Sequence, residues 1–267
     1  MRVIIQDNYD KMCLWAANHI KNRIAAHNSG ADKARPFVLG LPTGSSPLGV
    51  YKELIRMNKA GEISFANVLT FNMDEYLGLP GDHEQSFAYF MHINFFDHLT
   101  DMNPENINIP DGMTDDPEKE CAKYEKKIAS YGGVDLFMGG IGVDGHIAFN
   151  EPYTSLSSLT GVRDLTTDTR IANSRFFGGD PNAVPSQALS VGVGTITASK
   201  EVLILVNGHS KAGALAATVE GPVSSKCPCS ALQLHNDAII ACDEAACGEL
   251  TVNTYKYFLD IEKKERL

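Results

Sequence analysis

Three side chains able to transfer protons lie within eight residues of one another: Asp144, His146 and Glu151. Two carboxylates beside an imidazole suit general acid and base catalysis, because an acid can orient the imidazole and tune its proton affinity. Two more acids, Asp74 and Glu75, follow a separate apolar segment. Paired carboxylates there suit abstraction of a proton, although a solvated turn would explain them equally well. These residues together indicate proton-transfer chemistry.

A second set of residues is typical of anion binding. Ser46 is expected to cap the helix that begins near Pro47, so free N–H groups and the helix dipole would favour a phosphate at this turn. Simple helix capping is the alternative. Lys211 lies at the start of another predicted helix, where the helix dipole does not stabilise a cation. A bound anion would explain its presence. The candidate phosphate-binding residues of this turn are Thr43, Gly44, Ser45 and Ser46.

Three other interpretations of the segment around His146 need weighing. Gly140, Gly142 and Gly145 match the dinucleotide pattern G-x-G-x-x-G, but the loop-forming residues 150–155 stand where that site needs a helix. Carboxylates and imidazole also suit several divalent metals, although no second histidine lies nearby. A purely structural loop is the third.

Apolar runs typical of strands alternate along the chain with stretches in which apolar residues recur at helical spacing. These patterns define the strands and helices that must position the candidate residues. Polar residues from 154 to 180 are expected to be irregular. Alternating strands and helices predict a Rossmann-like α/β fold, an open, mostly parallel sheet with helices on both faces, in one domain of residues 1–267. Every candidate loop named above follows a predicted strand, where such sheets bind ligands. Strands are predicted at 1–5, 36–41, 68–72, 106–109, 134–138, 188–193, 201–206 and 238–242, and helices from 8 onward and at 48–60, 86–99, 116–129, 211–221 and 251–261.

Composition narrows the class of protein. The chain has 267 residues and a formal net charge of −10, with no cluster of lysine and arginine, which argues against a nucleic-acid partner. Its six cysteines lack the spacing of a disulfide framework, so reduced thiols in the cytoplasm are expected. Neither a signal-peptide pattern nor a membrane-spanning apolar run is present.

Four motifs resemble the glucosamine-6-phosphate deaminase (isomerase) family: LGLPTGSSP at 39–47, TFNMDEY at 70–76, GHIAFNEP at 145–152 and NSRFF at 173–177. The likeness runs from residue 1 to about 261. It implies reversible conversion of glucosamine 6-phosphate and water to fructose 6-phosphate and ammonia, with neither metal nor organic cofactor.

The resemblance also implies a role for each candidate residue. Asp74 would take the proton from C2 of the sugar, and His146 would serve ring opening, with Asp144 and Glu151 orienting it. The turn at 43–46 would hold the substrate phosphate together with Arg175 and Lys211.

The chain departs from the family pattern in two places. Many bacterial members are hexamers activated by N-acetylglucosamine 6-phosphate through a basic cluster after the catalytic loop. Here Gly161 stands in place of an arginine, Arg163 replaces a lysine, and Tyr257 is retained. Weak or absent activation is therefore expected. Residues 223–228, VSSKCP, replace an Asn-His-Met-Trp stretch and leave homo-oligomer formation open.

Three other functions remain open from the sequence. A 6-phosphogluconolactonase or pentose-phosphate isomerase of the same fold would not need Asp74 arranged with the His146 loop. A non-catalytic sugar-phosphate sensor would need the phosphate-binding residues but not the acids. A nucleotide-dependent oxidoreductase would need a cofactor, which a binding titration detects.

Overall fold

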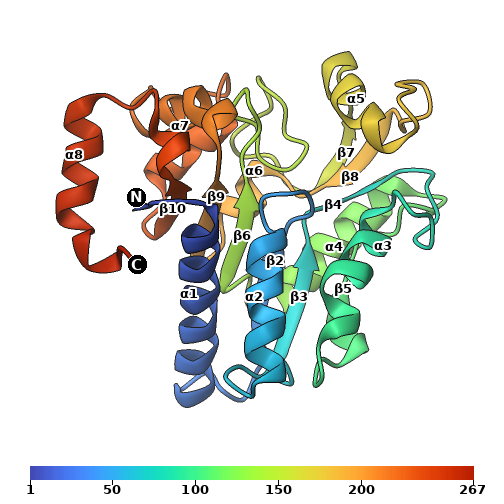
Figure 1. Ribbon diagram of the computed structural model, residues 1–267. Helices are drawn as coiled ribbons and strands as arrows, with labels where there is room; N and C mark the ends of the chain where they lie inside the picture. The colour runs from blue at the N-terminus through green and yellow to red at the C-terminus, as the bar shows by residue number, and fades with distance from the viewer.

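A seven-stranded parallel sheet forms the centre of the computed structural model, which describes residues 1–267 (Figure 1). The strand order is β1-β10-β9-β6-β2-β3-β5, and each neighbouring pair is parallel. The predicted parallel sheet is therefore confirmed. Its strands are β1 (Arg2–Gln6), β2 (Phe37–Leu41), β3 (Val68–Asn72), β5 (Ile107–Asn108), β6 (Leu136–Gly140), β9 (Glu201–Val206) and β10 (Ala238–Asp243).

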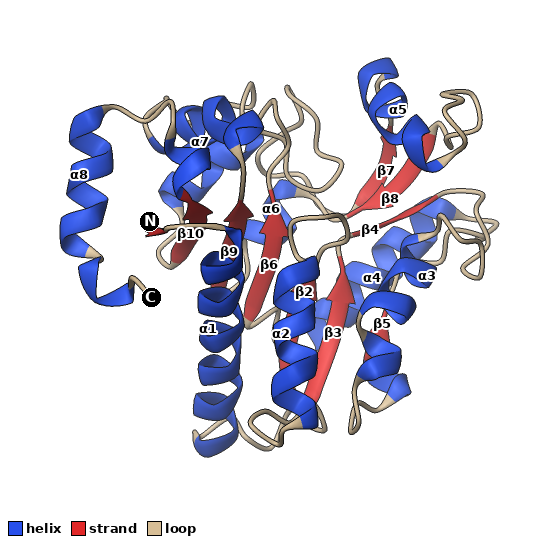
Figure 2. Ribbon diagram, in the orientation of Figure 1, coloured by secondary structure: helices blue, strands red, loops and turns tan.

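Helices cover both faces of this sheet (Figure 2). Successive strand residues point to opposite faces, so the sheet has a core on each side. Leu39 packs with helices α1 and α2, whereas the preceding Val38 belongs to the cluster that includes residues of α4, α7 and α8. The helices are α1 (Tyr9–Ser29), α2 (Leu48–Lys59), α3 (Phe87–Asn94), α4 (Pro117–Ser130), α5 (Thr167–Asn173), α6 (Val193–Thr197), α7 (Ala212–Val219) and α8 (Val252–Ile261).

A small antiparallel sheet lies beside the carboxyl end of β3, at the upper right of Figure 1. It contains β4 (Asp74–Tyr76), β8 (Gln187–Ser190) and β7 (Gly161–Asp164), in the order β4-β8-β7. Two predictions were wrong here. The segment 154–180 is not irregular, since it contains β7 and α5, and the strand predicted at 188–193 ends at Ser190. Neither β7 nor α5 has a buried residue, so neither produced an apolar pattern.

The order of strands reverses around β2. The chain leaves β2 for β3 on one side, and β6 later joins β2 on the other. Loops after β2 and β6 therefore flank the kind of crevice where open α/β sheets bind ligands. Met73 joins β3 to β4 through backbone hydrogen bonds to Leu41 and Val191, and so places the next residue, Asp74, at the same edge.

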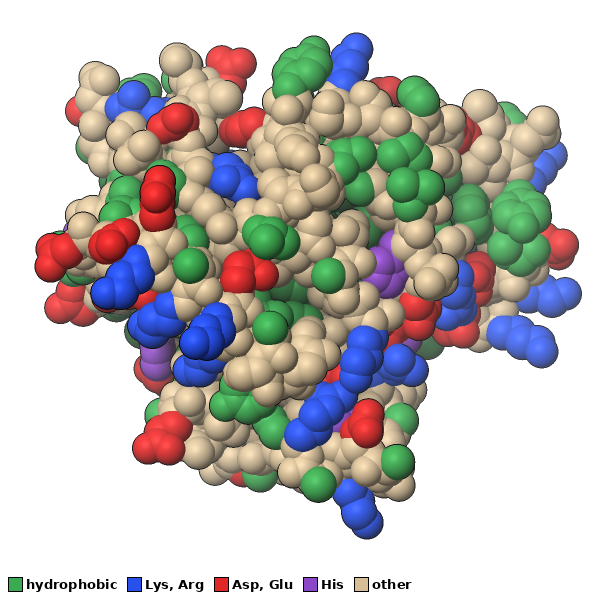
Figure 3. Space-filling view, turned by 180° about the vertical axis from the view of Figure 1, so that it is seen from behind, with side chains coloured by type: hydrophobic (Ala, Val, Ile, Leu, Met, Phe, Trp, Pro, Cys, Tyr) green, Lys and Arg blue, Asp and Glu red, His purple; other side chains and the backbone are tan.

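The rest of the molecule is conventional for an α/β protein. None of the helices combines the length and apolar character needed to cross a membrane. All six cysteines are unpaired and buried. On the face shown in Figure 3, acidic and basic side chains are interspersed.

Candidate active site

Asp74 is a buried carboxylic acid with a free oxygen. It lies in β4 opposite Ser190 of β8, the residue is 8% exposed, and its Oδ1 has no hydrogen-bond partner. Burial and the nearby charge of Glu75 raise the pKa of Asp74 to about 8. A carboxylate with this pKa is a much stronger base than an ordinary aspartate, so Asp74 has the properties of a general base.

The neighbouring acid, Glu75, has a structural role instead. Its carboxylate accepts hydrogen bonds from the backbone N–H groups of Phe87 (2.9 Å) and Ala88 (2.8 Å) at the start of α3, and of Tyr76 (2.8 Å). It thereby satisfies N–H groups that the helix leaves unpaired. Of the two adjacent acids, only Asp74 is free for chemistry.

The loop that carries the other acids is tightly folded after β6. Gly142 donates a backbone hydrogen bond to the carbonyl of His146 (2.8 Å), and a Cβ at Gly142 would lie 2.2 Å from the imidazole. Gly145 has a φ of +88°, which only glycine adopts easily. Ala148 also has a positive φ, 52°, between His146 and Glu151. Such strain persists where the surrounding structure enforces it, often at functional sites.

His146 lies between two carboxylates. Its Nδ1 is 2.7 Å from Oδ1 of Asp144 and 3.9 Å from Oε2 of Glu151. At the shorter distance the imidazole and the carboxylate are in direct electrostatic contact. The imidazole lowers the pKa of Asp144 to about 2, which keeps that acid ionised at neutral pH. Asp144 is exposed, whereas His146 and Glu151 are half-buried.

The small sheet brings this loop next to the strand of Asp74. Ser190 pairs with Asp74 in the sheet, and its Oγ accepts a hydrogen bond from the backbone N–H of Phe149 (3.0 Å). Asn150 donates from Nδ2 to the carbonyl of Val191 (2.8 Å). Both carboxylate sites therefore share β8 as a common support.

The turn after β2 differs from the prediction in one detail. Ser46 does not cap α2: the helix begins at Leu48, as predicted, but Pro47 occupies the cap position and there is no side-chain capping bond. The Ser46 hydroxyl instead donates to Oδ1 of Asn207, in the loop after β9 (2.6 Å). This bond holds the turn at 43–46 beside the loop that leads to Lys211. Gly44, with a φ of +97°, bends the turn.

The two cations predicted to bind phosphate, Lys211 and Arg175, form no ion pair. Lys211 is half-buried and has no carboxylate within 4.0 Å. Burial lowers the pKa of Lys211, while the charge of Asp144 opposes this change and that of Arg175 adds to it, so both groups lie within electrostatic reach of Lys211. The Arg175 guanidinium is 4.7 Å from the centre of the Phe176 ring, and Arg175 is likewise unpaired. Unpaired cations at one edge favour an anionic ligand.

Several residues of the site were missed from the sequence. Thr166 and Thr169 of the α5 segment hydrogen-bond to Glu151, and Asn207 holds Ser46. A helix-capping pattern, Thr166 followed by Thr169, was the available signal, because Thr166 accepts from the Thr169 N–H. The surrounding polar composition hid it.

The structure argues against the dinucleotide interpretation of the His146 loop, whereas the metal interpretation has a possible but incomplete set of ligands. No helix lies between β6 and β7, so the glycine pattern lacks the helix that a dinucleotide site requires. The ligand atoms of Asp144, His146 and Glu151 all lie within 4.8 Å of one another and could hold a metal ion from one side. One imidazole and two carboxylates form an incomplete set for a structural zinc.

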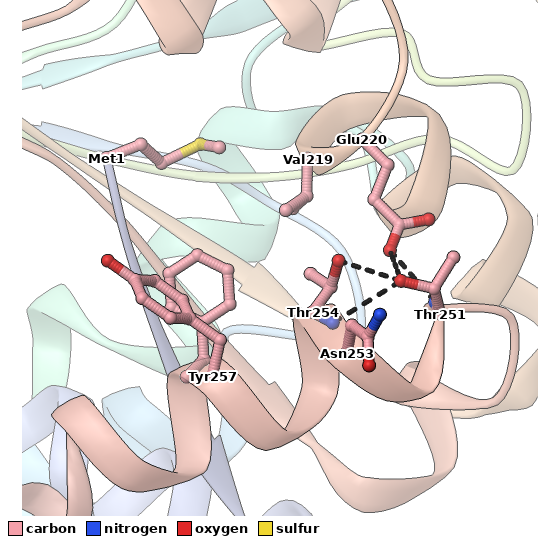
Figure 4. Close-up of a pocket in the computed structure, with 8 residues that line it drawn as sticks. Met1, Val219, Glu220, Thr251, Asn253, Thr254 and Tyr257 are labelled. Carbon is pink, nitrogen blue, oxygen red and sulfur yellow. Dashed lines mark hydrogen bonds between the residues drawn. The ribbon is translucent and has the colours of Figure 1, made fainter.

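A separate pocket of about 670 Å³ lies between the end of α7 and α8 (Figure 4). Its polar lining includes Glu220, whose carboxylate already accepts hydrogen bonds from the backbone and hydroxyl of Thr251 (both 2.8 Å). None of the candidate catalytic or phosphate-binding residues lines this pocket. It is therefore distinct from the site at the strand ends.

The fold and its loops define the class of α/β enzymes whose active site lies at the carboxyl ends of parallel strands. A family model described as glucosamine-6-phosphate isomerases/6-phosphogluconolactonase matches residues 7–241. The chain belongs to this family.

Known proteins divide this family further. The chain is 60% identical over 263 residues to a glucosamine-6-phosphate deaminase of Parabacteroides distasonis, covering 98% of this chain and 96% of the relative. It is 58% identical over 264 residues to a deaminase of Aliivibrio fischeri, covering 99% and 98%. A solved monomeric glucosamine-6-phosphate deaminase superposes with a TM-score of 0.86 and 40% identity over 92% of this chain and 99% of that one. A 6-phosphogluconolactonase from Trypanosoma cruzi, at 19% identity and a TM-score of 0.71, shares the fold.

Proposed function

We propose that residues 1–267 act as one glucosamine-6-phosphate deaminase domain in the cytoplasm. The reaction converts glucosamine 6-phosphate and water to fructose 6-phosphate and ammonia, reversibly, in amino-sugar metabolism. Relatives at 58–60% identity over nearly the whole chain support this activity. The six unpaired cysteines are in keeping with a reducing compartment.

The observation that carries the proposal is the buried, unpartnered carboxylate of Asp74 beside the His146 loop. Isomerisation of an amino sugar requires removal of the weakly acidic proton at C2. A base with a pKa of about 8, held where water is excluded, suits this step. Hydrolysis of a lactone needs no such carbon base, so this residue favours the deaminase over the lactonase.

The His146 cluster serves ring opening in this proposal. Opening the pyranose moves a proton from the C1 hydroxyl to the ring oxygen. An imidazole 2.7 Å from an ionised Asp144 is held ready to move that proton. Asp74 then takes the C2 proton while the C1 carbonyl oxygen is protonated, which gives an enolamine. Protonation at C1 converts the enolamine to an imine at C2, and water hydrolyses this imine to the ketone and ammonia.

The phosphate of the substrate is held by backbone N–H groups, hydroxyls and two cations. These groups come from the turn after β2 and from the segments of Arg175 and Lys211. Arginine offers two donors to one phosphate, and lysine supplies a compact charge. Binding energy from this non-reacting end of the sugar can then orient C1 and C2 at the catalytic groups. The proposed ligands are Thr43, Gly44, Ser45, Ser46, Arg175 and Lys211.

Asp74→Asn tests the proposal directly. The variant should lose exchange of the C2 proton with solvent and release of ammonia, because an amide is not a base. Inorganic phosphate should still bind, since the cations are unchanged. The measurements are deuterium incorporation by NMR and a coupled ammonia assay. Exchange at near the wild-type rate would mean that Asp74 is not the base, and a wild-type protein that releases no ammonia would end the deaminase proposal.

A further inference from the structure

Glu151 is held on its far side by the short helix α5. The Thr169 hydroxyl donates a short hydrogen bond to Oε1 of Glu151, and the Thr166 hydroxyl lies 3.4 Å from the same oxygen. The other oxygen, Oε2, faces Nδ1 of His146 at 3.9 Å. No lysine or arginine pairs with Glu151. The orientation of this carboxylate therefore depends on hydroxyls of α5.

The same helix leads directly to a proposed phosphate ligand. A single turn of 3-10 helix, Ser174–Phe176, follows α5 without a break and contains Arg175. The Ser174 N–H still donates to the carbonyls of Arg170 and Ile171, so both pieces form one rod. Thr169 and Arg175 are six residues apart, roughly 9 Å along a helix axis. One rod thus bears a hydroxyl that orients Glu151 and a cation suited to phosphate.

We propose that Thr169 is a positioning residue, which couples phosphate binding at Arg175 to the orientation of Glu151. A phosphate bound to Arg175 restrains the rod formed by α5 and the 3-10 turn. The rod then aligns Glu151 against His146 through the Thr169 hydroxyl. Binding energy from the phosphate end is thereby used at the proton-transfer end of the substrate. This inference rests on the proposed deaminase function.

The hydroxyl of Thr169 is not needed to build the helix. Thr166 is the N-cap, and it accepts from the backbone N–H of Thr169 (3.2 Å), which remains in any substitution at 169. Thr167, in the first turn of α5, is exposed and makes no side-chain hydrogen bond. It offers a matched control, because Thr167→Val makes the same change on the same helix away from Glu151.

The decisive experiment supplies the sugar and the phosphate portion of the substrate as two separate molecules. Turnover of phosphate-free glucosamine is measured with and without phosphite dianion, in the wild type, Thr169→Val, Thr169→Ser and Thr167→Val. Phosphite should accelerate the wild type, Thr169→Ser and Thr167→Val, but not Thr169→Val. On glucosamine 6-phosphate, Thr169→Val should lower kcat by roughly ten- to a hundredfold, the value of a hydrogen bond to a charged group, with little change in KM. Inorganic phosphate should still inhibit all four proteins competitively, since Arg175 and Lys211 are unchanged.

A double-mutant cycle separates positioning from general damage. If Thr169 acts through Glu151, Thr169→Val should have no further effect in a Glu151→Gln background. Additive losses, or retained phosphite activation in Thr169→Val, would overturn the inference. Should the valine variant fail to fold, Thr169→Ala removes the same hydroxyl with a better helix former. A wild type that does not deaminate glucosamine 6-phosphate would instead refute the proposed function.

Discussion

Asp74 shows how the setting of one residue changes its chemistry. Its carboxylate lies next in sequence to Glu75, yet Glu75 is occupied by three backbone N–H groups and Asp74 keeps a free oxygen. The charge of Glu75 nevertheless matters, because it helps to raise the pKa of Asp74. Burial, with a smaller contribution from the charge of Asp74, raises the pKa of Tyr51, Tyr76 and Tyr124, so these tyrosines are neutral.

The raised pKa predicts how activity depends on pH. A base must be ionised to act, so kcat/KM should fall by about tenfold per pH unit below a pKa of about 8 and level off above it. Glu75→Gln removes the nearby negative charge and should move this limb to lower pH. The measurement is a pH profile of kcat/KM for both proteins, corrected for titration of the substrate. A limb near pH 4 in the wild type would contradict the assignment.

His146 gives a second prediction at this scale. His146→Gln should reduce turnover of the closed ring more than turnover of an open-chain analogue, because the analogue needs no ring opening. The neighbouring Asp144 and Glu151 remain in place in this variant. Initial rates with both substrates provide the test, and equal losses on the two would exclude the ring-opening role.

At the scale of elements, Arg163 of β7 stabilises the segment between the His146 loop and β7 through hydrogen bonds. Its Nε donates to Oδ1 of Asn150 (3.2 Å) and its Nη2 to the carbonyl of Leu159 (2.9 Å). A Cβ at Gly161 would lie 2.7 Å from Nη1 of the same guanidinium. Arg163 therefore stabilises the loop from within, with fewer donors left for an external anion.

This arrangement adds a structural reason to expect weak activation by N-acetylglucosamine 6-phosphate. Gly161 supplies no cation, and each missing charge-assisted hydrogen bond costs roughly 1.5 to 3 kcal/mol of binding. Adding this compound should leave the substrate saturation curve almost unchanged. A titration at substrate concentrations below KM checks this, and strong activation would show that another cation replaces the lost arginine.

At the scale of the whole molecule, the proposed phosphate site depends on three separate parts of the chain. The turn after β2 is held to the loop after β9 by Ser46 and Asn207. Asp243, at the end of β10, accepts hydrogen bonds from the Gly208 N–H (2.9 and 3.1 Å) and so supports the loop of Lys211. Arg175 approaches from the small sheet and α5. Only the folded chain contains this site.

Inorganic phosphate should therefore stabilise the folded state. At ten times its dissociation constant, a ligand that binds only the native state adds about 1.4 kcal/mol to the free energy of unfolding. Lys211→Met should abolish most of this gain without lowering stability in phosphate-free buffer, because burial of the cation is unfavourable. Thermal unfolding with phosphate or with chloride at equal ionic strength provides the measurement. An equal shift in both proteins would place phosphate elsewhere.

The sequence by itself determined the parallel sheet and the loops that matter. Buried strands such as β9 contain continuous apolar runs, here residues 202–206, and helices such as α1 bury residues at helical spacing, so local patterns suffice. Asp74, His146 and Lys211 each follow a strand, which sets the edge where they must lie.

Only the tertiary structure decided how these residues are used. In the folded chain Glu75 accepts hydrogen bonds from the start of α3, Ser46 donates to Asn207, and Thr169 donates to Glu151. These bonds join segments up to 161 residues apart. The small antiparallel sheet was also not predicted from the sequence. Neither β7 nor α5 buries an apolar stripe, so neither has a periodic pattern that would reveal it. Burial, which raises the pKa of Asp74, arises only when those segments pack together.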